Sequence, residues 1–321
     1  MLNKPLVTCA FSTYNAESSI IKALQSAINQ TYENKEIVVV DDCSEDETLK
    51  KIKEFNLKIN ENIKIYENKI NVGIGEIRNQ LIKNSNGDFI AFFDDDDFSF
   101  PQRISEQIKF ITDFESKNKI EDSLSPLCYS KRKIFYSKKN YLICNSISFD
   151  TSKSPKNNGV LALLSAEKID NKAISGSTAT CTLCVRKKTL IKIGGFDRNL
   201  RRYEDLDLAI RSLMKNISLI SVENILIYQF YKNKSYKRNE ELYELKLILK
   251  HKRFLEKYKL FEFSLNFAKL KHSLFKFETL SSIKYFIYLF LNYPNNLFKK
   301  ISGTFKTFLF SILNKIFINQ L

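Results

Sequence analysis

The sequence predicts an α/β fold in which a mostly parallel, doubly wound sheet is followed by a helical, basic C-terminal region. Short apolar segments alternate with segments of helical apolar spacing throughout the first hundred residues, and this alternation is typical of parallel sheets. After about residue 235 the strand pattern stops, while helical spacing continues. We therefore expect one domain over residues 1–235 and a helical region over residues 236–321.

The composition is that of a folded chain with unevenly distributed charge. Hydrophobic residues make up 44% of the 321 residues, which is enough for a sizeable core. The net charge is +15, and residues 232–321 carry 18 Lys and Arg against 6 Asp and Glu. A basic region of this kind favours contact with an anionic surface, either phospholipid headgroups or nucleic acid.

The first half of the sheet is predicted from apolar runs and their spacing. Ser44, with Glu47 three residues later, matches a capping box and predicts that a helix begins there. The other expected elements alternate as strand and helix, with strands at residues 6–11, 36–40, 63–66 and 89–93 and helices at residues 18–30 and 74–83.

The second half of the domain has a less regular pattern. A polar loop is expected at residues 151–159, and helices are expected at residues 101–123 and 203–214. The expected strands lie at residues 128–136, 141–148, 181–185, 217–222 and 225–230.

Polar residues follow the predicted strands and should gather at one rim of the sheet. Residues 12–15 follow the first strand, Asp41 and Asp42 follow the second, and residues 94–97 follow the fourth. In doubly wound sheets, ligands bind outside the carboxyl ends of the strands. We therefore expect a binding site at this rim.

Four consecutive aspartates, Asp94 to Asp97, come directly after the apolar strand FIAFF. Adjacent carboxylates repel one another, and an oxygen-only ligand set suits Mg²⁺ or Mn²⁺. A solvated acidic turn is the alternative, and the position after a buried strand favours the metal. Asp42, Glu204 and Asp205 are further candidates, although acids at the start of a helix often serve only its dipole.

Five segments together resemble the family 2 glycosyltransferases, which have a GT-A fold. The resemblance covers about residues 5–232. The segments that carry it are STYN at 12–15, VVVDDCSEDET at 38–48, NVGIGEIRN at 71–79, FFDDDDFSFP at 92–101, and GGFD with ED at 194–205.

The resemblance implies a role for each matched residue. Tyr14 would lie against the uracil of a uridine-diphosphate donor, with Ser12 beside it. Asp42 would hold the base, and Arg78 and Asp95 would belong to the same donor site. Asp94 and Asp96 match the DxD metal motif; Asp95 and Asp97 offer the same spacing, and Pro101 favours the first pair. Asp205 matches the catalytic base, with Glu204 as its competitor.

The implied activity is metal-dependent transfer of a sugar from a nucleotide-sugar, with a UDP-sugar as the expected donor and Mn²⁺ or Mg²⁺ as the cofactor. The mechanism would be inverting, with a lipid-linked or surface glycan such as lipooligosaccharide, capsule or O-antigen as the acceptor. The chain has no Trp and so lacks the Gln-x-x-Arg-Trp motif of processive synthases. We therefore expect one sugar to be added per encounter.

Two other function classes are considered. One is another nucleotide-binding transferase on the same fold, although no GxxxxGK[ST] or GxGxxG phosphate loop occurs. The other is a basic membrane- or nucleic-acid-binding protein with an inactive domain; the Lys- and Phe-rich tail favours lipid, and no nucleic-acid partner is expected. Cys181 and Cys184 form a single CxxC, which we interpret as buried reduced thiols instead of a zinc site.

The C-terminal residues 297–318 place apolar and aromatic residues at helical spacing, with interspersed lysines. Such a helix is typical of the membrane interface; packing on the domain or on a second subunit is the alternative. No signal peptide and no spanning helix are apparent in the sequence. The expectation is a cytoplasmic protein held peripherally on the inner face of the membrane, with a homo-oligomer left open.

Overall fold

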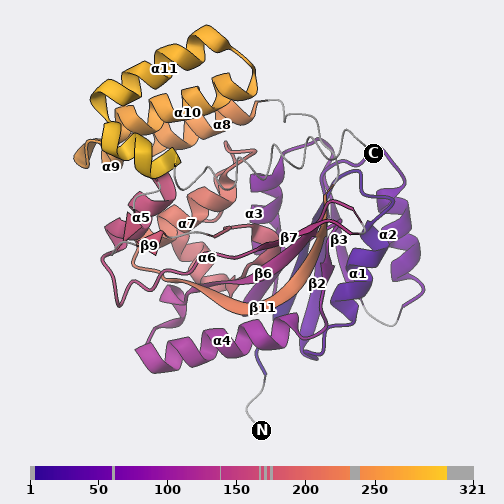
Figure 1. Ribbon diagram of the computed structural model, residues 1–321. Helices are drawn as coiled ribbons and strands as arrows, with labels where there is room; N and C mark the ends of the chain where they lie inside the picture. Colours follow the sequence, from indigo (N-terminus) through magenta and orange to yellow (C-terminus); the bar gives the residue numbers. More distant parts are fainter. Residues whose placement is uncertain are drawn as a thin grey trace. The chain divides into compact units, whose positions relative to one another are not determined.

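The computed structural model describes residues 4–301, apart from residues 60–61, 138, 166–167, 170–171, 174–175 and 232–238 (Figure 1). The chain divides into two compact units, each described here by itself. The first unit comprises residues 1–154 and 175–235, and the second comprises residues 155–174 and 236–321.

The first unit is built on a nine-stranded mixed sheet in the order β3-β2-β1-β4-β10-β6-β11-β5, with β7 paired to β6. The pairs β1–β2, β1–β4, β2–β3 and β6–β11 are parallel. The strands are β1 (Val7–Thr13), β2 (Lys35–Asp41), β3 (Ile63–Glu67), β4 (Phe89–Asp94), β5 (Phe98–Ser99), β6 (Leu127–Phe135), β7 (Tyr141–Cys144), β10 (Cys184–Arg186) and β11 (Leu219–Phe230).

Helices connect these strands, and Figure 1 shows them flanking the sheet. The first-unit helices are α1 (Ile20–Ile28), α2 (Thr48–Asn56), α3 (Ile74–Asn84), α4 (Arg103–Asn118), α6 (Lys187–Ile193) and α7 (Glu204–Met214), with short 3₁₀ turns η1 (Asp122–Leu124) and η2 (Thr180–Thr182). The predicted class, a doubly wound α/β sheet with helices after it, is confirmed.

The core lies on both faces of the parallel strands. Every residue of β1 is buried, which explains why the strand carries no charged residue and does not alternate between apolar and charged positions. Alternate residues such as Phe11 and Phe93 pack with helices α1, α2 and α4. On the other face Phe92 packs edge-on against Phe196, with ring centroids 5.6 Å apart. The strands are therefore held rigidly, and so are the residues at their ends.

The elements predicted in the first hundred residues are confirmed, but the predicted capping box is wrong. Helix α2 begins at Thr48, and the Ser44 side chain does not cap it. Ser44 Oγ instead donates to Asp41 Oδ1 at 2.6 Å and accepts from the Asn15 backbone N–H at 2.9 Å. The serine therefore ties the end of β1 to the end of β2, close to the predicted rim.

Three differences occur in the second half of the domain. The two strands expected after residue 217 form one strand, β11, with a shift of register between Val222 and Ile225, so the residues between them form an irregularity. Helix α5 (Lys156–Ser165) begins within the expected polar loop. Helix α6 was not predicted, because its seven residues are too few to show helical spacing.

The second unit contains α5, the short strands β8 (Lys168–Ile169) and β9 (Lys172–Ala173), and the helices α8 (Glu240–Lys250), α9 (Lys252–Lys257), α10 (Phe261–Phe275) and α11 (Thr279–Asn292). Glu244 on α8 contacts Lys271 Nζ at 2.7 Å and His272 Nε2 at 2.5 Å, both on α10. Burial alone would raise the pKa of Glu244, but these two partners lower it to about 2.

The predicted amphipathic helix at residues 297–318 lies outside the described residues after Ile301. Among the helices that are described, none has both the length and the apolar character needed to cross a membrane.

Candidate active site

A cavity of about 620 Å³ lies at the carboxyl ends of β1, β2 and β4. It brings together nearly all of the residues predicted from the sequence: Ser12, Tyr14, Asp42, Arg78, Asp94, Asp95, Asp96 and Glu204. Asp205 is not part of the lining, and neither is Asp97, the alternative metal residue. Because these residues lie far apart in the sequence, their convergence comes from the parallel register of the strands.

Tyr14 follows β1 and remains accessible. Its side chain is 45% exposed, while its backbone N–H donates to Asp95 Oδ2 at 3.1 Å. Asn15 has a positive φ of 50°, which turns the chain sharply after the strand. The ring is therefore presented at the edge of the cavity, where it can stack on a planar ligand.

Asp42 holds a loop as well as lining the cavity. Its Oδ1 accepts from the Val72 backbone N–H at 2.8 Å, and its Oδ2 accepts from the Gly73 backbone N–H at 2.9 Å. Asn68 Nδ2 also donates to Oδ1, at 3.3 Å. Oδ2 has a further acceptor site, so Asp42 can also receive a hydrogen bond from a bound ligand.

The four aspartates after β4 do not share one environment. Asp94, Asp95 and Asp96 line the cavity, whereas Asp97 does not and is only 7% exposed. Burial raises the pKa of Asp95 to about 7, against a hydrogen bond from Tyr14 that lowers it. Burial also raises the pKa of Asp94, and the Arg78 guanidinium opposes this rise.

Arg78 links the acidic run to helix α7. Its Nη1 donates to Glu204 Oε1 at 2.6 Å, and its Nη2 lies 3.9 Å from Asp94 Oδ1. Its guanidinium also lies over the Phe196 ring, 5.3 Å from the centroid. The side chain is only 6% exposed, so these charges interact in a largely dry environment. The sequence suggested a nucleotide contact for Arg78 and did not reveal this bridge.

Asp205 differs from its neighbour Glu204. No described cation forms an ion pair with it, and its Oδ1 accepts from the Leu206 backbone N–H at 2.7 Å. Burial, and then the Glu204 charge, raise the pKa of Asp205 to about 6. A carboxyl group with a pKa in this range is suited to accept a proton near neutral pH.

Two arginines in the lining were not singled out from the sequence. Arg201 and Arg202 lie just before Glu204, and Arg201 Nη1 donates to Asn71 Oδ1 at 2.8 Å. Guanidinium groups bind phosphate oxygens well. The two arginines just before Glu204 and Asp205 were therefore the sequence signal that could have identified a phosphate contact.

The residues present fit a divalent cation. The lining holds five carboxylates, from Asp42, Asp94, Asp95, Asp96 and Glu204, but only three guanidinium groups, from Arg78, Arg201 and Arg202. This surplus of negative charge is what a divalent cation offsets, and carboxylate oxygens are its preferred ligands.

The sheet order and the acidic cavity at the strand ends define the GT-A class of fold. S. aureus TarS in complex with UDP-GlcNAc matches with a TM-score of 0.57 and 19% identity, over 85% of this chain and 73% of that one. The mannosyltransferase PcManGT from Pyrobaculum calidifontis in complex with GDP-Man and Mn²⁺ matches with a TM-score of 0.55 and 13% identity, over 94% of this chain and 85% of that one. At these identities the likeness concerns the fold.

Sequence comparison places the domain in a family. Residues 8–118 match the model of Glycosyl transferase family 2. An uncharacterized glycosyltransferase of Rickettsia prowazekii is 31% identical over 204 residues, which is 64% of this chain and 57% of that protein. The Escherichia coli UDP-Glc:alpha-D-GlcNAc-diphosphoundecaprenol beta-1,3-glucosyltransferase WfgD is 37% identical over 106 residues, 33% of this chain and 41% of that protein.

Residues 8–118 therefore match Glycosyl transferase family 2, in agreement with the predicted family, and the fold is of the GT-A class. The match spans 57% and 41% of the length of the two sequence relatives, so it covers only part of each.

Proposed function

We propose that this protein transfers a single sugar from a UDP-sugar to a hydroxyl group of a lipid-linked or surface glycan, with inversion at the anomeric carbon. The observation that carries the proposal is the single cavity that joins Tyr14, Asp42, the acidic run and Arg78. Two similar proteins add support: WfgD is a glucosyltransferase that uses UDP-Glc and a diphosphoundecaprenol-linked acceptor, and TarS was solved with UDP-GlcNAc.

The donor would occupy the cavity with its base beside Tyr14 and its diphosphate beside the acidic run. The exposed Tyr14 ring offers a stacking surface, and Asp42 offers a hydrogen-bond acceptor. Arg201 and Arg202 supply positive charge for phosphate oxygens. A divalent cation held by Asp94 and Asp96, Mn²⁺ or Mg²⁺, would offset charge that develops on the leaving diphosphate.

Asp205 is the proposed base, which takes the proton from the acceptor hydroxyl. Its raised pKa of about 6 suits this role, while Glu204 is held by Arg78 at 2.6 Å. The Arg78–Glu204 pair fixes the first turn of α7, and this orients Asp205. Arg78 is thus a positioning residue, linking donor and acceptor sides of the site.

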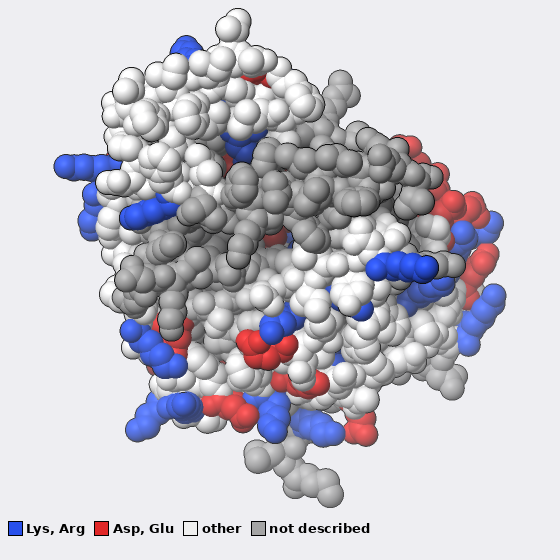
Figure 2. All heavy atoms as spheres, viewed as in Figure 1, with Lys and Arg blue, Asp and Glu red and all other residues white. Residues whose placement is uncertain are grey.

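We also propose that the second unit rests on the cytoplasmic membrane surface, where a lipid-linked acceptor would be found. Helix α11 buries Ser282 and Leu289 and leaves an apolar stripe on the outside: Leu280, Ile283, Ile287, Phe290 and Leu291. Figure 2 shows the surface over α10 and α11 as largely uncharged, with scattered lysines. A helix that is apolar on two faces needs a second apolar environment.

Nucleotide binding measured by calorimetry tests the proposed function. UDP, GDP and CMP would each be titrated with and without Mn²⁺ into the wild type and Asp96→Ala. Binding of UDP that requires Mn²⁺ and is lost in the variant supports the proposed donor and metal ligand. Absence of UDP binding in the presence of metal would overturn the proposed donor class.

A further inference from the structure

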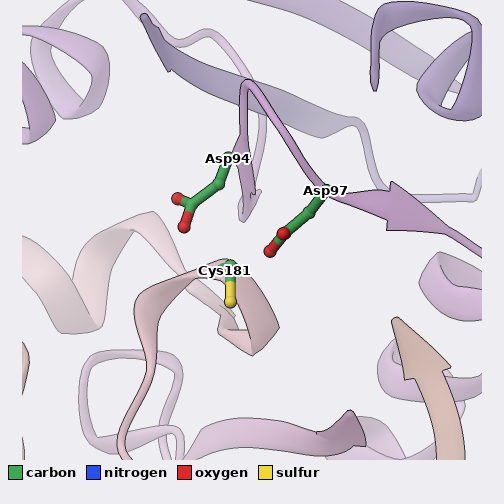
Figure 3. A group of neighbouring side chains, drawn as sticks. All are labelled: Asp94, Asp97 and Cys181. Atoms are coloured by element: carbon green, nitrogen blue, oxygen red, sulfur yellow. The ribbon is translucent and has the colours of Figure 1, made fainter. Parts of the chain in front are cut away.

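A second group of potential ligands lies beside the cavity. Asp94 ends β4, Asp97 lies in the turn before β5, and Cys181 lies in the 3₁₀ turn η2; one ligand atom from each lies within 4.8 Å of the others (Figure 3). Figure 3 shows the Asp97 carboxylate extending toward Cys181, with the Asp94 carboxylate to one side. Asp97 and Cys181 are not part of the cavity lining. This group, the Asp94–Asp97–Cys181 cluster, is not used by the proposed reaction.

Asp97 points to a missing ligand. Its Oδ2 accepts from Gln229 Nε2 at 3.3 Å, but its Oδ1 is buried and accepts no hydrogen bond from any described residue. The residue is only 7% exposed, so water does not readily satisfy this oxygen. An unpaired buried carboxylate oxygen is costly, and both a cation and a proton would relieve it.

The nearby basic groups supply only part of the missing charge. Arg132 Nη1 lies 3.8 Å from Cys181 Sγ, and the Arg132 charge also opposes the rise that burial causes in the pKa of Asp97. Arg78 is 3.9 Å from Asp94 but 2.6 Å from Glu204, so its charge is already shared. The remaining carboxylate charge therefore favours a bound cation over an empty site.

The ligand chemistry separates this cluster from the open cavity. The cavity offers oxygen ligands, which suit Mg²⁺ and Mn²⁺. The cluster adds a sulfur, which Mg²⁺ disfavours and Zn²⁺ or Co²⁺ accepts in tetrahedral sites of mixed S and O ligands. Burial and the Asp97 and Asp94 charges raise the pKa of Cys181, and Arg132 beside the sulfur opposes this rise and so favours the thiolate that such a cation requires.

We propose that Asp94, Asp97 and Cys181 form a buried site for a thiolate-accepting divalent cation such as Zn²⁺ or Co²⁺, separate from the cation site of the donor cavity. On binding, the Cys181 thiol loses its proton to solvent and a metal–sulfur bond forms, with no change of oxidation state. Asp94 belongs to both sites, so occupation of the cluster alters the binding of the donor cation.

Absorption spectroscopy with Co²⁺ tests this site without nucleotide. Titration of the reduced wild-type protein should produce a near-ultraviolet sulfur-to-cobalt charge-transfer band. The band should be lost in Cys181→Ser and strongly reduced in Asp97→Asn. It should persist in Cys184→Ser, which changes a buried cysteine outside the cluster, and in Asp96→Asn, which changes the cavity-facing ligand.

Several outcomes would overturn the proposal. The proposal fails if the wild type shows no sulfur-to-cobalt band, or if the band survives in Cys181→Ser. It also fails if Cys184→Ser loses the band to the same extent as Cys181→Ser. Circular dichroism and Mn²⁺-dependent UDP binding of Cys181→Ser check that this variant is folded. The measurement contains no nucleotide, so a failure of UDP binding, which bears on the proposed function, is distinguishable from a failure of this site.

Discussion

Asp205 and Glu204 are neighbours in the first turn of α7, yet their surroundings give them different properties. Glu204 is paired with Arg78 at 2.6 Å, whereas burial raises the pKa of Asp205 to about 6. The sequence alone left both as candidates for the base. The ion pair holds the Glu204 carboxylate against Arg78, whereas Asp205 has no such partner among the described cations and is the better candidate to accept a proton.

Asp205→Asn should lower kcat by roughly 10²-fold to 10⁴-fold, because the amide cannot accept the acceptor's proton. UDP affinity should be nearly unchanged, since Asp205 does not line the cavity. Initial rates and calorimetry on the same preparation measure both. Glu204→Gln is the matched control, and it should weaken donor binding because it releases Arg78. A variant Asp205→Asn with nearly wild-type kcat would exclude Asp205 as the base.

The rate should depend on pH through the same residue. Below its pKa of about 6, Asp205 is protonated and cannot act as a base, so kcat should rise with pH across that value and then level off. Rates at saturating donor and acceptor, measured from about pH 5 to about pH 8, give the profile. UDP binding over the same range serves as the control. A flat profile with intact binding would contradict the assignment.

At the scale of elements, helix α3 is placed by a close approach of backbone to backbone. A Cβ atom added at Gly75 would lie 2.6 Å from the Asp197 carbonyl oxygen and 3.3 Å from Arg198 Cα. The glycine therefore lets α3 contact the GGFD segment. Arg78 lies on this helix one turn later. The close approach at Gly75 therefore also positions Arg78 to contact Glu204.

Gly75→Ala should destabilise the protein by roughly 1–3 kcal/mol through overpacking and should weaken UDP binding. Denaturant unfolding and calorimetry check the two effects. Gly194→Asn is the control: Gly194 has a φ of +93°, and a Cβ there meets nothing within 4 Å. Asn tolerates left-handed backbone better than most side chains, so the remaining backbone strain should cost less than the clash in Gly75→Ala. Equal effects of the two variants would remove the packing argument.

At the scale of the whole molecule, charge and apolar surface are distributed between the two units in different ways. The first unit concentrates acidic groups in its cavity, and the second exposes the apolar stripe of α11 together with Lys284 on the same helix. This arrangement suits a catalytic domain that receives soluble donor and a helical unit that contacts an anionic bilayer.

Ile287→Glu combined with Leu291→Glu should abolish sedimentation with vesicles that contain anionic phospholipid, because it places charge on the apolar stripe of α11. Both side chains are exposed, so the fold should persist. Leu57→Glu is the control, since Leu57 is 87% exposed but lies in the first unit. Unchanged sedimentation of the double variant would show that this stripe does not bind membranes.

Much of the fold could be predicted from the sequence, because its signals are local. Apolar runs and helical spacing identified the strands and helices of the first hundred residues, and strand ends followed by polar residues indicated the rim. Prediction failed where tertiary contacts override local pattern. Ser44 bonds to Asp41 and Asn15 instead of capping α2, and a register shift merges two expected strands into β11.

Local sequence patterns were enough to indicate the family resemblance, the sheet class and the residue types of the site. How those residues are paired depends on the tertiary packing. Arg78 and Glu204 are separated by 126 positions, and no local pattern predicts their 2.6 Å contact. The direction of Asp97, away from the cavity and toward Cys181, likewise depends on the turn between β4 and β5. Local periodicity specifies elements, but long-range packing specifies which charges meet.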